Sequence, residues 1–172
     1  TLKSGDLQPF FPLCSVREAY NPVEFLISSE TSSYIDLSES FLSLSAKVVQ
    51  HDGSDCATTD KVAPSNLFAH ALFQNCEVYL NGTLISDSSG AYPYIAYMQR
   101  VLTKSPVEKA TSMKEEFFYP NNEPDCYDIA KDDGFKKRYE LTQKSKEFSV
   151  TMQPVANIFT QTRYLPGGTE LR

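Results

Sequence analysis

The chain has 172 residues, of which 41% are hydrophobic, with 11 Phe and 10 Tyr but no Trp. Its formal net charge of −6 argues against nucleic-acid binding as the main role, because phosphate recognition needs basic surfaces. No run reaches the roughly 20 apolar residues that span a bilayer, and the proline-broken segment 1–13 is too polar for a signal peptide. We therefore expect a globular chain with no membrane span, no signal-peptide secretion and no direct nucleic-acid role.

Residues 1–14 are predicted to form an N-terminal arm, since Pro9 and Pro12 interrupt a segment whose Phe10 and Phe11 favour burial. Such an arm packs either on its own domain or on a neighbour. Residues 15–172 are predicted to form a single domain. The first strand pattern in it covers 15–29, including Val16 and Tyr20, and is clearest over 23–27.

Residues 34–50 form the longest segment of extended pattern. The apolar residues Ile35 and Leu37 fall on one parity, and those from Leu42 to Val48 fall on the other. Because a one-residue slip moves every side chain to the opposite face, the pattern predicts a bulge or turn across 38–41. The apolar spacing of residues 65–74 then predicts a helix, with Ser65 as a possible N-cap.

The stretch 76–86 predicts a β-hairpin, because Asn81 and Gly82 readily adopt the positive φ values of a type I′ turn. A two-residue loop would pair Leu80 with Thr83, Tyr79 with Leu84 and Val78 with Ile85. Both faces of the hairpin carry apolar side chains. We therefore expect it to be covered on both sides, at the centre of a sheet and not at its edge. Asn81-Gly82-Thr83 also matches a glycosylation sequon, but the turn already accounts for these residues.

Residues 92–103 give the clearest helix pattern, with Pro93 in the first turn. One apolar stripe runs along it, which predicts a core contact or a subunit contact and not a ligand site. The residues selected for this packing role are Tyr94, Tyr97, Met98 and Leu102.

The remainder of the chain predicts a weaker helix over 107–118, a long acidic surface loop over 121–134 and a strand over 146–152. The basic triplet 136–138 beside two aspartates is interpreted as a solvated turn. After a turn at 165–168, residues 169–172 begin a further strand that the chain does not finish, and we therefore expect one sheet to show an unpaired edge.

Little chemistry is visible in the sequence. It lacks the nucleophile-elbow, P-loop and zinc-protease motifs, and its four cysteines form no C-x-x-C pair. Reduced, mostly buried thiols are expected. The spacing of His51, Asp52 and Asp55 fits no standard metal site, and nothing favours a pair between Cys56 and either histidine. We predict a non-enzymatic protein without metal or cofactor, with His70 in a structural role.

About seven strand candidates with short helices between them predict a mainly β protein, an antiparallel jelly-roll β-sandwich with short helical inserts. Several motifs, in this order, resemble the N-terminal part of the major capsid proteins of Polinton (Maverick) elements and adintovirus-like viruses. They are Tyr34-Ile35-Asp36-Leu37, Asn66-Leu67-Phe68, Leu72-Phe73, Glu77-Val78-Tyr79-Leu80-Asn81-Gly82, Tyr92-Pro93-Tyr94-Ile95-Ala96-Tyr97 and the segment 158–168.

The resemblance implies a double jelly-roll capsid protein that forms homotrimeric, pseudo-hexagonal capsomers, contacts other capsid subunits and tiles an icosahedral shell. It implies residence in the virion capsid after assembly inside the host cell, in the cytoplasm or nucleus, and no active site. The chain departs from that family in length, since it can supply only the first of two jelly rolls. We therefore expect a truncated first half that self-associates or packs against a second jelly roll.

Other interpretations remain open. The chain could be a β-sandwich binding module in which the loop 121–134 holds a carbohydrate or a protein. It could also be a host protein derived from a captured capsid gene, or a single jelly-roll vertex protein.

Overall fold

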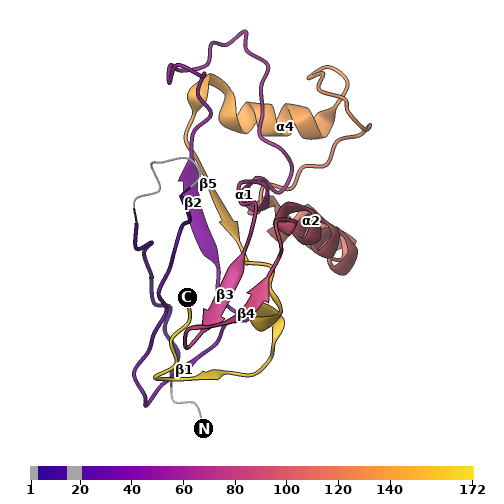
Figure 1. Cartoon of the computed structure of the whole chain (residues 1–172). Helices are drawn as coiled ribbons and strands as arrows, with labels where there is room; N and C mark the ends of the chain where they lie inside the picture. Colours follow the sequence, from indigo (N-terminus) through magenta and orange to yellow (C-terminus); the bar gives the residue numbers. More distant parts are fainter. Residues whose placement is uncertain (1–3, 15–20) are drawn as a thin grey trace. The chain divides into compact units, whose positions relative to one another are not determined.

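A computed structural model describes residues 4–14 and 21–172 (Figure 1). The chain forms two compact units. The first combines the described residues up to 38 with 77–87 and 156–172, and the second combines 39–76 with 88–155. The part of the predicted first strand that includes Val16 and Tyr20 lies outside the described residues.

The first unit contains the predicted hairpin, formed by β3 (Glu77–Leu80) and β4 (Thr83–Asp87). Asn81 and Gly82 have φ values of 47° and 75°, as the type I′ turn requires. The predicted pairs of Leu80 with Thr83 and Tyr79 with Leu84 are confirmed. The pairing of Val78 with Ile85 is wrong, because a register shift next to Val78 pairs it with Ser86.

The C-terminal segment lies at the centre of this arrangement. Leu171 makes antiparallel bridges to Leu80 on one side and to Ile27 on the other. The backbone of Arg172 donates to Tyr79 O at 2.9 Å and accepts from Tyr79 N at 2.7 Å. The segment that the sequence predicts to begin a further strand is therefore paired on both sides. Of the predicted strand at 23–27, the structure keeps only the bridge at Ile27.

The expectation that the hairpin is covered on both sides is wrong for β4. Leu84 and Ile85 are 47% and 45% exposed. Among the described residues, β4 is hydrogen-bonded to β3 alone, so it is an edge strand and the bulge beside it follows the usual protection of such edges.

A second strand pair of the first unit joins β1 (Tyr34–Ile35) to β6 (Leu165–Pro166), and the single-turn helix η3 (Asn157–Thr160) precedes β6. Gly167 comes directly after β6 and lies against the backbone of Glu30. A Cβ at this position would overlap the carbonyl oxygen of Glu30. The buried apolar side chains of this unit are Leu37, Val78, Phe159 and Leu171.

In the second unit, β2 (Leu42–Ala46) pairs antiparallel with β5 (Phe148–Met152). The predicted parity switch is confirmed, because a turn around Ser38 separates β1 from β2. The serine-rich face of the ribbon is wet, with the hydroxyl oxygens of Ser45 and Ser149 3.1 Å apart. The apolar face packs on Ala69 and Phe117, whose ring centroid lies 5.0 Å from that of Phe148.

The helices of the second unit include one that the sequence predicts residue for residue, α2 (Tyr92–Thr103). The helix expected at 65–74 is only α1 (Phe68–Ala71), and its N-cap is Leu67 in a left-handed conformation, so a cap at Ser65 is wrong. The weaker helix expected at 107–118 is divided into α3 (Pro106–Ala110) and the 3₁₀ turn η1 (Ser112–Lys114).

One helix, α4 (Asp133–Thr142), was not predicted, and η2 (Gln143–Ser145) follows it. The interpretation of residues 136–138 as a solvated turn is wrong, because they lie within α4 and Arg138 is only 3% exposed. The structure thus shows the expected antiparallel strands, as several short pairs, together with helices, and with α4 included the helical residues outnumber the strand residues among those described.

Candidate interaction site

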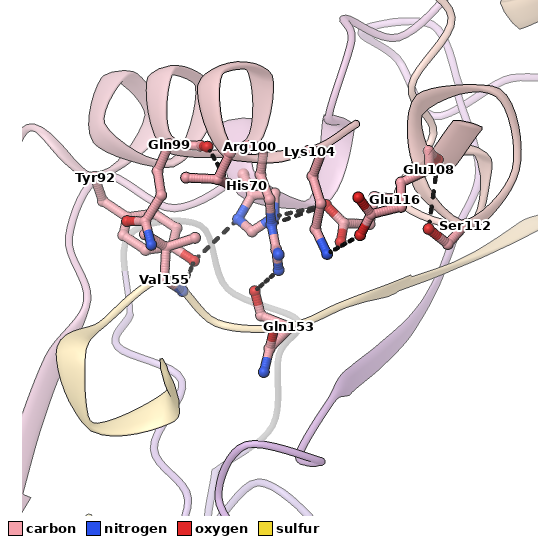
Figure 2. Close-up of polar contacts among 11 residues, drawn as sticks. His70, Tyr92, Gln99, Arg100, Lys104, Glu108, Ser112, Glu116, Gln153 and Val155 are labelled. Atoms are coloured by element: carbon pink, nitrogen blue, oxygen red, sulfur yellow. Dashed lines mark hydrogen bonds and ion pairs between the residues drawn. The ribbon is translucent and has the colours of Figure 1, made fainter. Parts of the chain in front are cut away.

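The inner face of α2 is held by buried polar side chains (Figure 2). The Tyr92 hydroxyl lies 3.0 Å from Nδ1 of His70 and accepts a hydrogen bond from the Val155 N–H at 3.2 Å. Because the Glu116 carboxylate beside Nε2 can only accept, Nε2 carries a proton, and in the neutral imidazole Nδ1 then accepts from the Tyr92 hydroxyl. The Nε2 proton is donated to Oε2 of Glu116, 3.4 Å away.

Arg100, two turns further along α2, joins the same network. Its Nη2 donates to the backbone oxygen of Gln153 at 2.7 Å. Its Nε lies 3.2 Å from Oε2 of Glu116, an ion pair in which the N–H is not aligned for a hydrogen bond. The network thus connects α1, α2, the segment after η1 and the segment after β5.

This network is almost fully desolvated: His70 and Tyr92 are each 1% exposed, and Arg100 is 7% exposed. Burial raises the pKa of Tyr92 to about 12, although the hydrogen bond from Val155 acts in the opposite direction. Tyr92 therefore keeps its proton and its donor role at physiological pH. His70 has the structural role predicted for it, since its ring is enclosed between Tyr92 and Glu116.

The outer face of α2 carries four of the five residues of the predicted apolar stripe, and these four do not pack in the core, whereas the fifth, Val101, packs against a buried cluster. Tyr94 is 78% exposed, Leu102 is 74%, Met98 is 56% and Tyr97 is 42%. The residues that α2 buries are Tyr92, Ala96 and Arg100. A core role is thus wrong for the four exposed residues but not for Val101, and the alternative prediction of a subunit contact is untouched by the exposure of these four.

The amphipathicity of α2 is therefore inverted. Arg100 is the only charged residue of the helix, and it points inward. A surface helix ordinarily turns its charged side chains to water and its apolar stripe to the core. An uncharged apolar helix face in solvent is typical of interaction surfaces.

The two hairpin residues selected from the sequence, Asn81 and Gly82, lie in a different unit from α2. Asn81 has a contact that the sequence did not predict: its Oδ1 accepts from Glu170 N at 3.0 Å, and its own N–H donates to Glu170 O at 2.8 Å. Asn81 thereby connects the turn to the C-terminal segment. Gly82 has open space around its Cα, so its requirement is the positive φ alone.

An open hollow in the second unit contains two other residues that the sequence analysis considered. His51 and Cys56 line it, together with valines 48, 49 and 62. The Cys56 thiol contacts the Val48 carbonyl oxygen at 3.7 Å, and His70 is not among the lining residues. The structure thus places His51 and Cys56 in one hollow, but His70 does not join them there. Within residues 4–14 and 21–172 no cluster of three His, Cys, Asp or Glu side chains is placed to hold a metal.

All four cysteines are free thiols, but Cys14 is exposed and the other three are only partly buried, so the expectation of mostly buried thiols is wrong.

The acidic segment before α4 is anchored at its end. Asp132, 1% exposed, caps α4 by accepting from Phe135 N at 2.6 Å and also accepts from Asn122 N at 2.7 Å. Burial raises the pKa of Asp132. The hydrogen bonds from these N–H groups and the charge of Arg138 lower it by more than burial raises it, so the net shift is downward.

Comparison with known proteins gives one partial similarity. An uncharacterized protein of Caenorhabditis elegans, F54H12.2, is 27% identical over 92 residues, which cover 49% of this chain and 22% of that protein. The chain therefore matches about a fifth of the length of this relative. No family model matches the chain, and no solved structure matches it. Among the described residues, no helix combines the length and the apolar character needed to cross a bilayer.

Proposed function

We propose that this chain is a structural domain of a capsid protein, which self-associates and contacts other capsid subunits to build a shell. The observation that carries the proposal is the inverted α2, whose outward side chains are apolar and uncharged. A protein whose role is assembly needs such a surface, because apolar contacts between copies supply most of the association free energy. The ordered sequence motifs that resemble Polinton and adintovirus capsid proteins indicate which assembly.

The N-terminal arm adds support. Leu7 and Phe11 are 76% and 78% exposed, and Leu13 is 56% exposed although its N–H donates to Glu24 O at 2.8 Å. Of the two predictions for the arm, packing on its own domain and packing on a neighbour, these exposures favour the neighbour.

The finer architecture is also part of the proposal. We assign the antiparallel β4–β3–C-terminal segment–Ile27 arrangement and the β2–β5 pair to the strands of one jelly roll, the first of a double jelly roll. In this assignment three copies form the capsomer, and the protein resides in the virion capsid after assembly inside the host cell.

Light scattering and negative-stain microscopy of the purified chain test the proposal. We expect a mass near three times 19.3 kDa at high protein concentration and, under assembly conditions, particles with a pseudo-hexagonal outline or shells. A monomer at every concentration, alone and mixed with candidate companion subunits, would overturn it.

A second candidate is a non-enzymatic binding module, favoured by the segment between Tyr119 and α4. Tyr127 there is 65% exposed, while Asp132 and Arg138 fix the segment to the helix. An exposed aromatic side chain on an anchored loop is suited to a carbohydrate or protein ligand. A glycan array and a pull-down, each repeated with Tyr127→Ala, separate this candidate from the capsid.

A further inference from the structure

We infer that the outer face of α2 is a two-fold contact between two copies of this chain, with Met98 at the symmetry axis. The inference rests on the proposed function only for the role of the contact, which is to join neighbouring capsomers. The pairing itself is argued from α2 alone.

The spacing of the exposed side chains favours a second helix as the occupant. Tyr94, Met98 and Leu102 are four residues apart and form one continuous ridge. Ridges of this kind interdigitate when two helices cross at about −50°. With the helices antiparallel about a two-fold axis, Met98 meets Met98 of the second copy, and each Tyr94 packs against the other Leu102.

Charge indicates that the second helix belongs to a copy of the same chain. Two copies with a net charge of −6 each repel one another over most of their surfaces. The α2 face is free of that repulsion, since the helix has no outward charge. In an isologous contact each residue faces its own equivalent, so an uncharged face is the arrangement that two identical acidic chains require.

The size of the face sets the expected affinity. The five exposed side chains present roughly 600 Å², which equals about the smallest area per partner of a specific interface. They are Tyr94, Ile95, Tyr97, Met98 and Leu102. We therefore expect a reversible dimer with a dissociation constant on the order of micromolar or weaker.

Sedimentation analysis of paired charge variants tests the contact. Met98→Glu and Met98→Lys should each weaken dimerisation at least about tenfold, since each places two like charges at the axis. Mixing them should restore a heterodimer, because opposite charges then meet. The matched control is Leu141→Glu on α4, which is also an exposed apolar position and should leave association unchanged.

A cross-linking measurement covers the case in which a charged variant folds poorly. Met98→Cys should form a covalent dimer with a short bismaleimide linker above the background of the four native cysteines, and Leu141→Cys should not. Equal association of wild type and both charge variants, or no gain on mixing, would overturn the inference. Because the contact joins neighbouring capsomers, trimers should persist in those variants, and shells should not form; if shells still form, the α2 pairing is wrong and the capsid proposal stands. If pairing through Met98 occurs without trimers or shells, the reverse holds.

Discussion

Two helices of the second unit, α2 and α4, make opposite use of the same ingredients. Each buries one arginine on its inner face, Arg100 in α2 and Arg138 in α4. The outward side chains of α4 include Lys136, Lys137 and Glu140, all ordinary for a helix in water. The outward side chains of α2 are apolar.

The two helices also differ in how they begin. Asp132 caps α4, whereas Ala91 at the start of α2 offers no side-chain cap. α4 is thus complete as a solvent-facing helix, with its cap, its charges and its buried contacts in place. α2 is held from inside by a polar network, and its apolar outer face is exposed. The contacts that hold α2 lie on its inner face, and the surface that we propose for association is its outer face. Mutations can therefore separate an effect on stability from an effect on association.

The largest loss of stability is expected for the buried arginine that donates hydrogen bonds to the larger number of acceptors. Arg138 donates to Pro64 O, Asn66 Oδ1, Tyr119 O and Asn121 Oδ1. Arg138→Met removes a donor from each of these acceptors, of which Asn66 Oδ1 still accepts from Tyr119 N, and should lower the free energy of unfolding by about 3–5 kcal/mol, measured by urea denaturation.

Arg100→Met should cost less, about 2 kcal/mol, because Glu116 keeps its contact with His70. Lys137→Met, on the exposed face of α4, is the control and should change stability by less than about 0.5 kcal/mol. Equal losses for the two arginine variants would contradict the idea that α4 depends more on its arginine than α2 does.

The next effect comes from the close approach of α4 to the loop before it. A Cβ on Gly134 would overlap the carbonyl oxygen of Pro120. Because this oxygen belongs to the backbone, it cannot rotate away as a flexible side chain could. Helix propensity alone predicts that Gly134→Ala stabilises α4 by up to about 1 kcal/mol. We expect instead a loss of about 3 kcal/mol from overpacking, read from thermal or urea unfolding. A stabilised variant would show that the helix can move away from Pro120, and Lys136→Ala provides the neutral reference.

Tyr92 sharpens the comparison on the side of α2. Tyr92→Phe removes the hydroxyl that accepts from Val155 and donates to His70, and should cost about 2 kcal/mol. It should also change the alkaline behaviour. The pKa of Tyr92 rises from 10.0 to about 12 on folding, so its contribution to stability is complete below pH 10 and is lost as the pH rises to about 12.

Unfolding measured at several alkaline pH values should therefore show a smaller decline for Tyr92→Phe than for wild type. Tyr94→Phe, on the exposed face of the same helix, should follow the wild-type curve. Identical slopes for wild type and Tyr92→Phe would mean that Tyr92 ionises no differently in the folded and unfolded chain.

The parts of this structure that the sequence predicts are those whose signal is local. Asn81-Gly82 specifies its turn from two residues, and α2 begins and ends at the predicted positions because twelve consecutive residues share one period. The strand β5 follows from the alternation in 146–152. In each case the neighbours along the chain contain the information.

The parts that the sequence did not predict depend on distant partners. Leu171 makes bridges to Ile27 on one side and Leu80 on the other, and both partners are distant in the sequence. The His70 network combines side chains from three separated segments with backbone groups from a fourth, and nothing in the sequence spacing marks them as neighbours. The stripe on α2 was correctly recognised, but periodicity cannot tell whether a face is turned to the core or to solvent. The inward position of Arg100 could not be predicted either, because an apolar stripe in the core with the arginine in water is the ordinary arrangement of such a helix.

The smallest effect concerns the junction after α2, where α3 begins with a complete capping box. Ser105 Oγ accepts from Glu108 N at 3.3 Å, and Glu108 Oε2 accepts from Ser105 N at 2.9 Å, with Lys104 beside Glu108 Oε1 at 2.9 Å. Ser105→Ala should lower stability by about 1 kcal/mol. These contacts, the Ser105 N–H foremost, lower the pKa of Glu108 from 4.5 to about 2. Its contribution is therefore present above pH 4.5 and is lost as the pH falls to about 2.

Glu108→Gln separates the cap from the charge, because a glutamine oxygen can still accept from Ser105 while the carboxylate and its titration are gone. This variant should remain close to wild type at neutral pH and show a shallower loss of helicity, followed by circular dichroism, between pH 4.5 and about 2. If Ser105→Ala and Glu108→Gln showed the same acid dependence as wild type, the box would not hold α3 in solution. Neither variant should alter association through the outer face of α2. That independence separates the capping box of α3, which contributes to folding, from the outer face of α2, which we propose contributes to assembly.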